Sequence, residues 1–419
     1  MAATDTYRRV IALTGPALPV LSFLGRLPVA MIQFGSVLLV AETSGSLGTA
    51  GLVGGALAVG QVACGPLVAR LADRRGQRPV VLCFALLNAV AVAALVAASM
   101  ADLRSIVLTL LGAAAGATVP AIGPLARSRL VTLARQRDGA DEQVIGAAMS
   151  LEGTLDETAF VLGPALVGLA AVVAHPAAAL ALAAVLVAAC GSAFALHPTA
   201  ELARKAAPAA SSAPKRAPAP PRAVYLLCAS LALQGAMFGA AQAGIAALTE
   251  ELGQPEQAGL VYAAMGVMSA VVGLGMAAVP ARYGLQLRRR VATGAGLLLS
   301  LPLLWAHSLW ALYAIVVVLG ITIAPHLISV FGLTERAVPP VRLGQAMAFA
   351  TSALVGGQAL SVAVSGRLAE AYGPAAAFGL GVVAMGLCFV LALGRAAGAG
   401  TKREVTRSAR SSRAYAPPG

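Results

Sequence analysis

The chain has 419 residues, of which 59% are hydrophobic and 11% are charged, whereas soluble domains carry about 25% charged residues. This composition excludes a water-soluble protein, and no polar segment is long enough to form a separate soluble domain. A formal net charge of +13 would suggest nucleic-acid binding in a soluble chain. Here its meaning depends on where the basic residues lie relative to the apolar stretches.

Twelve apolar stretches predict twelve transmembrane helices. Most are about 17–25 residues long, the length that an α-helix needs to cross a bilayer, and they are bounded by charges or turn residues. In chain order they cover residues 17–40, 48–68, 80–98, 105–126, 145–170, 176–196, 225–248, 258–279, 291–305, 309–330, 344–364 and 374–393. We therefore expect an all-α membrane protein embedded in a lipid bilayer.

The basic residues predict the orientation of these helices. If the N-terminus is cytoplasmic, 27 of the 30 Lys and Arg residues lie in cytoplasmic segments. Arg104 and Arg367 lie on the opposite side, and Arg26 lies inside the first stretch. Lys and Arg are enriched in cytoplasmic loops, and an odd number of spans would scramble this alternation. The sequence thus predicts a multi-pass plasma-membrane protein with both termini in the cytoplasm.

A segment rich in Pro, Ala and Ser divides the chain into two halves. Residues 198–223 have the composition of a flexible cytoplasmic linker. We expect a six-helix bundle over residues 1–197, a second over 224–394 and a basic cytoplasmic tail over 395–419. The linker separates the twelve helices into six and six.

Three short sequence matches relate the two halves. They pair Ala-Gly-Leu-Val at 50–53 with 258–261, Arg-x-Gly at 74–76 with 282–284, and Gly-x-Ala-Met at 146–149 with 344–347. The first two are displaced by 208 residues and the third by 198, so each sets a helix against the one six further along the chain. Such a parallel repeat is typical of transporters whose pseudo-symmetric halves rock around a site at the bilayer midplane.

The loop after the second stretch combines charges with a glycine. Residues 69–82 read ARLADRRGQRPVVL. Asp73, close to a helix end, can pair with Arg74 or Arg78 and with a neighbouring helix terminus, while Gly76 permits a tight turn. Such a latch holds one conformation and breaks in another. The alternative, a solvated basic loop, explains the arginines but not Asp73 together with Gly76.

This loop resembles the cytoplasmic signature of the major facilitator superfamily, Gly-x-Leu-Ala-Asp-Arg-x-Gly-Arg-Arg/Lys. Ala69 replaces the leading glycine, and Gln77 replaces one basic residue. The resemblance implies twelve transmembrane helices in two pseudo-symmetric six-helix bundles. It also implies transport by alternating access.

The fifth stretch carries three acidic residues, Glu152, Asp156 and Glu157, seven to twelve positions from its cytoplasmic end. At a rise of about 1.5 Å per residue they lie inside the hydrocarbon, and Arg26 in the first stretch is similarly deep. Each such charge costs about 2.5–3.5 kcal/mol on insertion scales, so four uncompensated charges would cost on the order of 10 kcal/mol. These groups must therefore be paired, hydrated or neutralised.

Pairing and proton binding are the two hypotheses for these four residues. Glu152 and Asp156 are four residues apart and share a helix face, whereas Glu157 points about 100° away. A structural ion pair of Arg26 with Asp156 or Glu157 is the simpler hypothesis. However, one arginine cannot neutralise three carboxylates, and apolar surroundings favour the neutral form of a carboxyl. We also expect at least one of them to bind and release a proton near neutral pH, so all four are candidates for proton coupling.

Residues 159–168 resemble the fifth-helix signature of exporting members of the superfamily, Gly-x-x-x-Gly-Pro-x-x-Gly-Gly. Gly163, Pro164 and Gly168 match this signature, while the two outer glycines are replaced by other residues. Small residues let helix backbones approach closely, and the proline bends the helix; an ordinary kink is the alternative. The resemblance implies drug/proton antiport and hence export.

The arginine that these exporters carry in their fourth helix has no counterpart here. Leu108 occupies its place, and Arg127 lies at the predicted cytoplasmic end of the fourth stretch. Arg26 is the candidate to replace this arginine in a proton relay.

Four glutamines inside predicted spans are candidates to line a substrate cavity, namely Gln33, Gln234, Gln242 and Gln358. Gln234 follows Arg26 by 208 residues, so the repeat would place the two across the pseudo-symmetry axis. Hydrogen bonding between helices is the more frequent role of such amides.

We expect a secondary active transporter that exports small amphipathic molecules by proton antiport through alternating access. A proton-coupled importer of a small metabolite is the alternative. An enzyme would need clustered catalytic residues or a phosphate-binding loop, and a sensor would need a recognition domain; the sequence has neither. We expect a monomer with no nucleic-acid partner, no cofactor beyond the proton gradient as energy source, and no metal, because the five cysteines lack metal-type spacing.

Overall fold

The computed structural model describes residues 3–137, 142–206, 222–254, 257–280 and 282–394, and their regular structure is helical. The first half contains α1 (Ala3–Thr14), α2 (Ala17–Ser44), α3 (Leu47–Arg75), α4 (Gln77–Met100), α5 (Ser105–Ala117), α6 (Ile122–Arg137), α7 (Glu142–Val173), α8 (Pro176–Leu196) and α9 (Thr199–Ala206). The second half contains α10 (Arg222–Glu251), α11 (Ala258–Gly275), η3 (Met276–Ala278), α12 (Leu285–Ser300), η4 (Leu301–Trp305), α13 (Leu309–Ala337), η5 (Pro340–Arg342), α14 (Leu343–Tyr372) and α15 (Pro374–Leu393).

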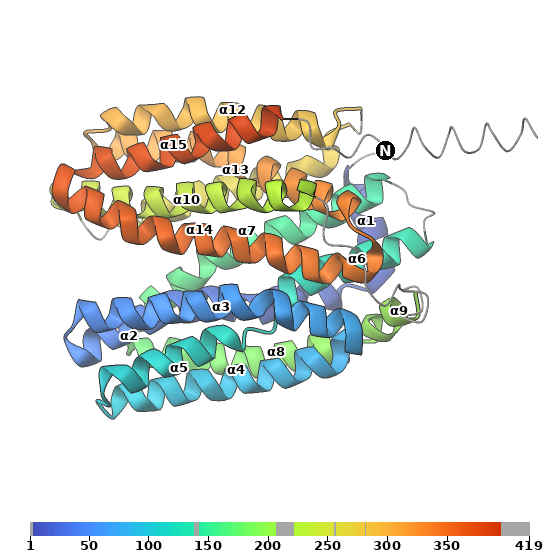
Figure 1. Ribbon diagram of the computed structural model, residues 1–419, viewed down its shortest axis with the longest axis horizontal. Helices are drawn as coiled ribbons and strands as arrows, with labels where there is room; N and C mark the ends of the chain where they lie inside the picture. The colour runs from blue at the N-terminus through green and yellow to red at the C-terminus, as the bar shows by residue number, and fades with distance from the viewer. Residues whose placement is uncertain (1–2, 138–141, 207–221, 255–256, 281, 395–419) are drawn as a thin grey trace, which may run out of the picture.

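The two halves form separate bundles whose long helices run along the longest axis of the molecule (Figure 1). Across the boundary, α3 packs against α14 and α7 packs against α11. These two contacts exchange under the sequence repeat, because α3 corresponds to α11 and α7 corresponds to α14. The bundles are therefore related by the pseudo-symmetry that the repeats predict.

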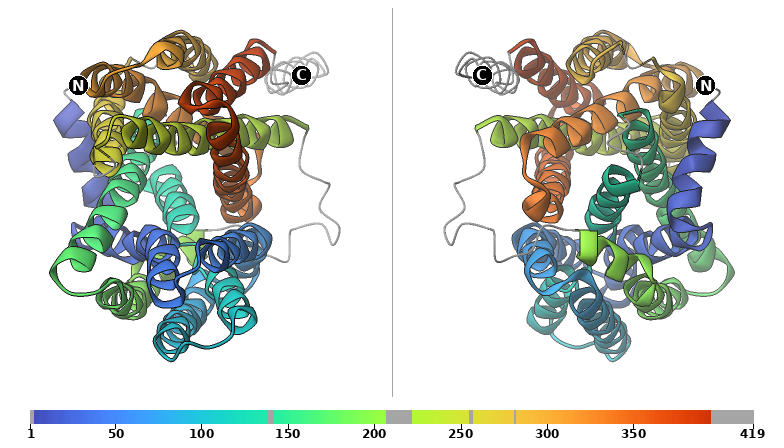
Figure 2. Two further views of the ribbon diagram at one scale, coloured as in Figure 1. Left: turned by 90° about the vertical axis from the view of Figure 1, so that its left-hand side faces the viewer. Right: turned by 90° about the vertical axis from the view of Figure 1, so that its right-hand side faces the viewer.

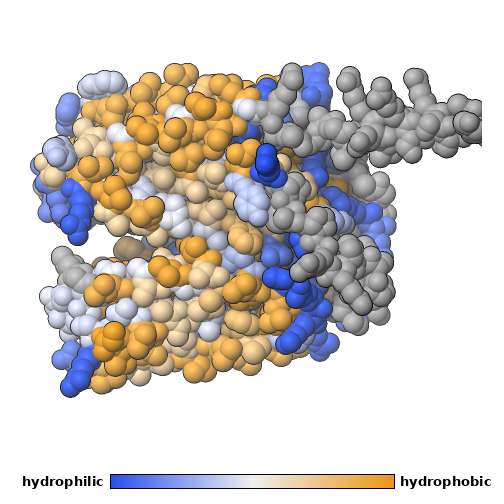
Figure 3. All heavy atoms as spheres, viewed as in Figure 1, coloured by the Kyte–Doolittle hydropathy of each residue, from blue (hydrophilic) through white to orange (hydrophobic). Residues whose placement is uncertain are grey.

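The predicted spans agree with the helices observed. Eleven stretches of the described residues are long and apolar enough to cross a membrane. The remaining predicted span, 291–305, is formed by α12 and its short 3₁₀ continuation η4, which contains Pro302. Apolar side chains cover the outside of both bundles between polar ends, as contact with lipid requires (Figure 3). The all-α fold of twelve helices in two bundles is confirmed.

The fourth predicted span, 105–126, is not one continuous helix. It breaks after α5 and resumes as α6, which continues to Arg137. Pro120 lacks an N–H and disfavours helical geometry at Val119, and Ala121 adopts a positive φ of 52°.

Two short α-helices of the described residues, α1 and α9, lie outside the predicted spans. The first, α1, packs against α6 and α7 and also contacts η3 of the second half. The second, α9, occupies the beginning of the predicted linker 198–223, so the start of that segment is helical rather than irregular. Residues 207–221 and the predicted tail 395–419 lie outside the described residues.

The two ends of the molecule differ in how the bundles meet. We call the end that carries α1 and α9 the α1 end (Figure 1). At this end Arg135 of α6 pairs with Glu335 of α13, and Arg336 of α13 pairs with Glu142 of α7. At the opposite end the surface is hollowed between the bundles (Figure 3), and we call this the open end. The bundles are thus joined at one end and parted at the other.

Candidate functional site

A cavity lies between the two bundles. Its lining comes from α2, α3, α6 and α7 on one side and from α10, α11, α13 and α14 on the other. Its empty volume is about 1360 Å³, including the part open to solvent. The broken stretch at Val119, Pro120 and Ala121 forms part of the wall. Non-helical backbone at membrane depth is tolerated where it lines such a cavity.

The structure brings Arg26 together with two of the three predicted carboxylates. Its Nη1 donates to Asp156 Oδ1 at 2.7 Å, and its Nη2 pairs with Glu152. The guanidinium also donates to the backbone oxygen of Glu152, at 3.1 Å, and to Ser22 on its own helix. Glu152 is 1% exposed and Arg26 is 5% exposed, so this pair is buried between α2 and α7. The shared face of Glu152 and Asp156 is the face that meets Arg26.

Arg127 is a second cation in this cluster. The sequence places it at the end of a span, but the guanidinium is 2% exposed and its Nη2 pairs with Asp156. Its Cζ also lies 3.9 Å from the ring centroid of Phe331, on α13 of the other bundle. The sequence does contain a signal for this second cation, because three buried carboxylates cannot all be neutralised by Arg26 alone. The break before α6 turns this arginine inward.

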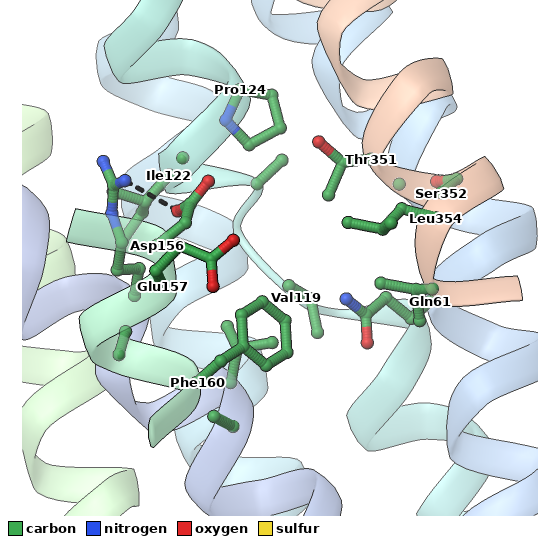
Figure 4. Close-up of a pocket in the computed structure, with 18 of the residues that line it drawn as sticks. Gln61, Val119, Ile122, Pro124, Asp156, Glu157, Phe160, Thr351, Ser352 and Leu354 are labelled. Carbon is green, nitrogen blue, oxygen red and sulfur yellow. Dashed lines mark hydrogen bonds and ion pairs between the residues drawn. The ribbon is translucent and has the colours of Figure 1, made fainter. Parts of the chain in front are cut away.

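Glu157 differs from the other two carboxylates. It is 8% exposed and lines the cavity, and it belongs to none of the ion pairs formed within the described residues. In Figure 4 its carboxyl points into the cavity beside Phe160, away from the Asp156 carboxyl and its dashed contact. Arg26 and Arg127 therefore balance Glu152 and Asp156, and Glu157 is the remaining acidic group.

The opposite wall of the cavity is uncharged. Thr351, Ser352 and Gln358 of α14 line it, and Gln61 of α3 lies at its edge (Figure 4). The 198-residue offset relates Asp156 and Glu157 to positions 354 and 355, which are leucine and valine and also line the cavity. The pseudo-symmetry therefore does not extend to the charged side chains of the lining, which are Arg26, Arg127, Asp156 and Glu157 and all lie on the first-half wall.

The four predicted glutamines occupy different environments. Gln358 lines the cavity, while Gln33 donates to Gln61 at 2.9 Å and so lies one side chain behind the lining. Gln234 is 1% exposed, and Gln242 is half-buried; neither is among the residues that line this cavity. Gln234 therefore does not face Arg26 across the cavity. The presence of a glutamine inside a predicted span does not reveal whether its side chain lines the cavity or packs between helices.

The predicted latch places Asp73 against a helix terminus. Its Oδ2 accepts a hydrogen bond of 2.8 Å from the backbone N–H of Gln345, in the first turn of α14. A carboxylate there interacts favourably with the positive end of the helix dipole. Arg74 and Arg78 are exposed, and among the described residues neither forms an ion pair with Asp73. Gly76 makes the turn between α3 and α4 with φ of 92°, which favours glycine.

Replacing Gly344 by alanine should loosen this latch. A Cβ at this position would lie 2.4 Å from Asp73 Oδ1, so the carboxylate has to rotate away from α14. We expect the α1 end to open more often, which can be measured as faster thiol labelling of a cysteine introduced at Ala72, which is 1% exposed in this structure, in a chain otherwise free of cysteine. The control is Gly146→Ala at the position related by the repeat, where an added Cβ meets nothing within 4 Å. Equal labelling of the two variants would contradict the role of Asp73.

The helix motif contains one close contact and one open position. An added Cβ at Gly163 would lie 2.6 Å from the Cβ of Ala30, so this glycine lets α7 approach α2. At Gly168 nothing lies within 4 Å. Pro164 lies inside α7, which is helical from its first to its last residue. The close approach at Gly163 brings α7 near the helix that carries Arg26.

Comparison with known proteins identifies a family. The sequence model described as "Major Facilitator Superfamily" matches residues 20–244 and 224–414, one match for each half of the chain. No curated protein matches the sequence significantly. The two matched ranges together cover most of the chain.

Solved structures with the same fold include an organic anion transporter and a homologue of an iron transporter. The crystal structure of the human organic anion transporter MFSD10 (TETRAN) has a TM-score of 0.68 and 19% identity, over 92% of this chain and 99% of that one. A bacterial homologue of the iron transporter ferroportin, in its outward-facing state, has a TM-score of 0.71 and 16% identity, over 90% and 98% of the two chains. The same homologue with soaked iron has a TM-score of 0.70 and 14% identity, over the same shares. At these identities the likeness concerns the fold.

Proposed function

Within the Major Facilitator Superfamily, to which this chain belongs, we propose that it exports small amphipathic cations in exchange for protons. Glu157 would carry the proton and the cation in turn. The observation that carries this proposal is a buried carboxylate that lines the cavity and lacks the arginine partner that its two neighbours have. The chain is a membrane transporter rather than an enzyme, and the proposal concerns its substrate, direction and coupling.

The charge of the cavity favours a cation over an anion. Arg26 is paired with Glu152 and Asp156, and Arg127 is paired with Asp156 and stacks on Phe331, so each of these two cations already has a carboxylate partner. With Glu157 ionised the cluster has one excess negative charge. Either a proton or a substrate cation can neutralise it, and binding of one opposes binding of the other.

The other lining groups favour an organic cation with apolar surface. The rings of Phe160, Phe238 and Tyr262 line the same cavity, and aromatic faces attract cations that approach them closely. Hydroxyl and amide groups of Thr351, Ser352 and Gln358 can orient polar parts of the substrate. A single carboxylate without an arginine partner, Glu157, among aromatic rings suits an organic ammonium better than a metal ion, which takes several N, O or S ligands.

The direction of transport is supported by sequence. The α1 end carries the segments in which the basic residues gather, so we propose that it faces the cytoplasm and that the open end faces outward. We further propose that the protein resides in the plasma membrane. The signature around Gly163 and Pro164 resembles that of exporters. Protons entering from outside would then drive cations out.

Transport in proteoliposomes tests this proposal. A pair of xanthene dyes of similar size supplies the contrast, with rhodamine 6G as the cation and fluorescein as the anion. With an acidic interior, antiport predicts accumulation of rhodamine 6G as protons leave, at least tenfold above protein-free liposomes, and no accumulation of fluorescein. Uptake that requires an acidic exterior would indicate import by symport, and preference for fluorescein would contradict a cationic substrate.

A further inference from the structure

The N-terminal helix α1 contacts both bundles, although it belongs to neither set of six helices. It packs against α6 and α7 of the first bundle and against η3 of the second. Both views in Figure 2 show α1 running along the side of the molecule from one bundle to the other. It therefore crosses the boundary at the end where the bundles are joined.

The attachment of α1 to the first bundle is apolar and buried. Val10 is 0% exposed and belongs to a buried cluster that includes Leu130 of α6, Val144 of α7 and also Met276 of η3, while α1 packs mainly against α6 and α7. Thr6 and Thr14 are also buried, at 4% and 6% exposure. Removing such a helix from the first bundle would expose an apolar stripe to water.

The attachment of α1 to the second bundle includes one specific hydrogen bond. The hydroxyl of Tyr7 donates to the backbone oxygen of Leu274 at 2.8 Å. Leu274 lies in the last turn of α11, where backbone carbonyls lack partners within the helix. The ring of Tyr7 packs against the buried cluster, and Ala277 of η3 packs against the same cluster.

We propose that α1 is a strap that holds the α1 end closed and must release the second bundle before that end can open. When the bundles separate here, α6 and α7 move away from α11 and η3, and α1 cannot stay attached to both. The attachment that breaks is the one to the second bundle, because α1 packs more extensively against α6 and α7 than against η3, and its bond to Leu274 is an exposed hydrogen bond. Alternating access is thereby coupled to an element outside the twelve spans.

Spin labels on the two bundles test the strap without any substrate. Cysteines replacing Arg78 and Leu287, both exposed at the α1 end, would carry the labels in a chain otherwise free of cysteine. Tyr7→Phe keeps the ring and removes the hydroxyl. The population of molecules with the longer, open distance, relative to those with the closed distance, should therefore rise roughly fivefold. Tyr372→Phe, at a residue 77% exposed near the other end of the molecule, is the matched control and should leave the ratio unchanged.

Reversible cross-linking tests the same proposal in the opposite direction. Cysteines at Tyr7 and Ala277, joined by a short thiol-specific reagent, should lower transport more than tenfold, and a reducing agent should restore it. Either cysteine alone, treated with the same reagent, is the control. Unchanged transport after complete cross-linking would overturn the proposal, as would a Tyr7→Phe distance distribution equal to that of the parent.

Discussion

Replacing Glu157 by glutamine should abolish proton-driven transport while leaving the fold intact. Glutamine keeps the size and hydrogen-bonding shape of the side chain but cannot exchange a proton. The loss of a charged partner should also weaken cation binding by about 1.5–3 kcal/mol, or roughly 10- to 160-fold. Gradient-driven uptake of rhodamine 6G in proteoliposomes and its binding to the purified protein measure the two effects.

The pH dependence of binding distinguishes Glu157 from a purely structural role. If one proton and one cation compete for this carboxylate, the cation binds more weakly at low pH. Once Glu157 is mostly protonated, the apparent Kd for the cation should rise tenfold for each unit by which the pH falls. Glu157→Gln should bind weakly with no such dependence. Glu250→Gln, at an exposed glutamate of α10, is the control and should behave as the parent. Full proton-driven uptake by Glu157→Gln would remove this residue from the coupling step.

Removing Arg26 alone should be among the most destabilising single changes in this chain. Arg26→Gln would leave Glu152, which is 1% exposed, as a buried charge without its guanidinium partner. Breaking a buried pair from one side typically costs about 3–5 kcal/mol. The expected result is a large decrease in the thermal unfolding temperature of the purified protein in detergent.

A double variant provides the critical comparison for this effect. Arg26→Gln combined with Glu152→Gln removes both members of one pair and leaves Arg127 facing Asp156, so the cluster is balanced again. Most of the lost stability should return, with a coupling energy of about 2 kcal/mol or more between the two positions. If the two single effects simply add, the pair does not act as the structure indicates.

Features that depend on hydropathy and charge could be predicted from the sequence. Apolar length and the distribution of basic residues predict the twelve spans, because lipid forces every crossing segment to satisfy its own backbone hydrogen bonds. The cost of burying charges predicts that Arg26 meets carboxylates of the fifth span, and helical spacing predicts that Glu152 and Asp156 act together. These features follow from the need to satisfy backbone hydrogen bonds in lipid and to compensate buried charges, and they do not depend on how the helices pack in detail.

Features that depend on packing between distant segments could not be predicted in the same way. The break at Pro120 extends α6 and turns Arg127 inward, which a single apolar stretch does not reveal. Gln33 and Gln358 look alike in the sequence, yet one lies behind the cavity wall and the other lines it. The docking of α1 depends on a carbonyl of Leu274 more than 260 residues away. Such contacts require the relative positions of the bundles.

The stacking of Arg127 on Phe331 links the electrostatics of one bundle to the position of the other. Any movement that withdraws the ring would admit water to the guanidinium and screen its attraction for Asp156. Asp156 would then depend more on Arg26, which it already shares with Glu152. The negative potential at neighbouring Glu157 would change as well. Under the proposed function, proton binding to Glu157 and the relative movement of the two bundles would therefore be thermodynamically linked.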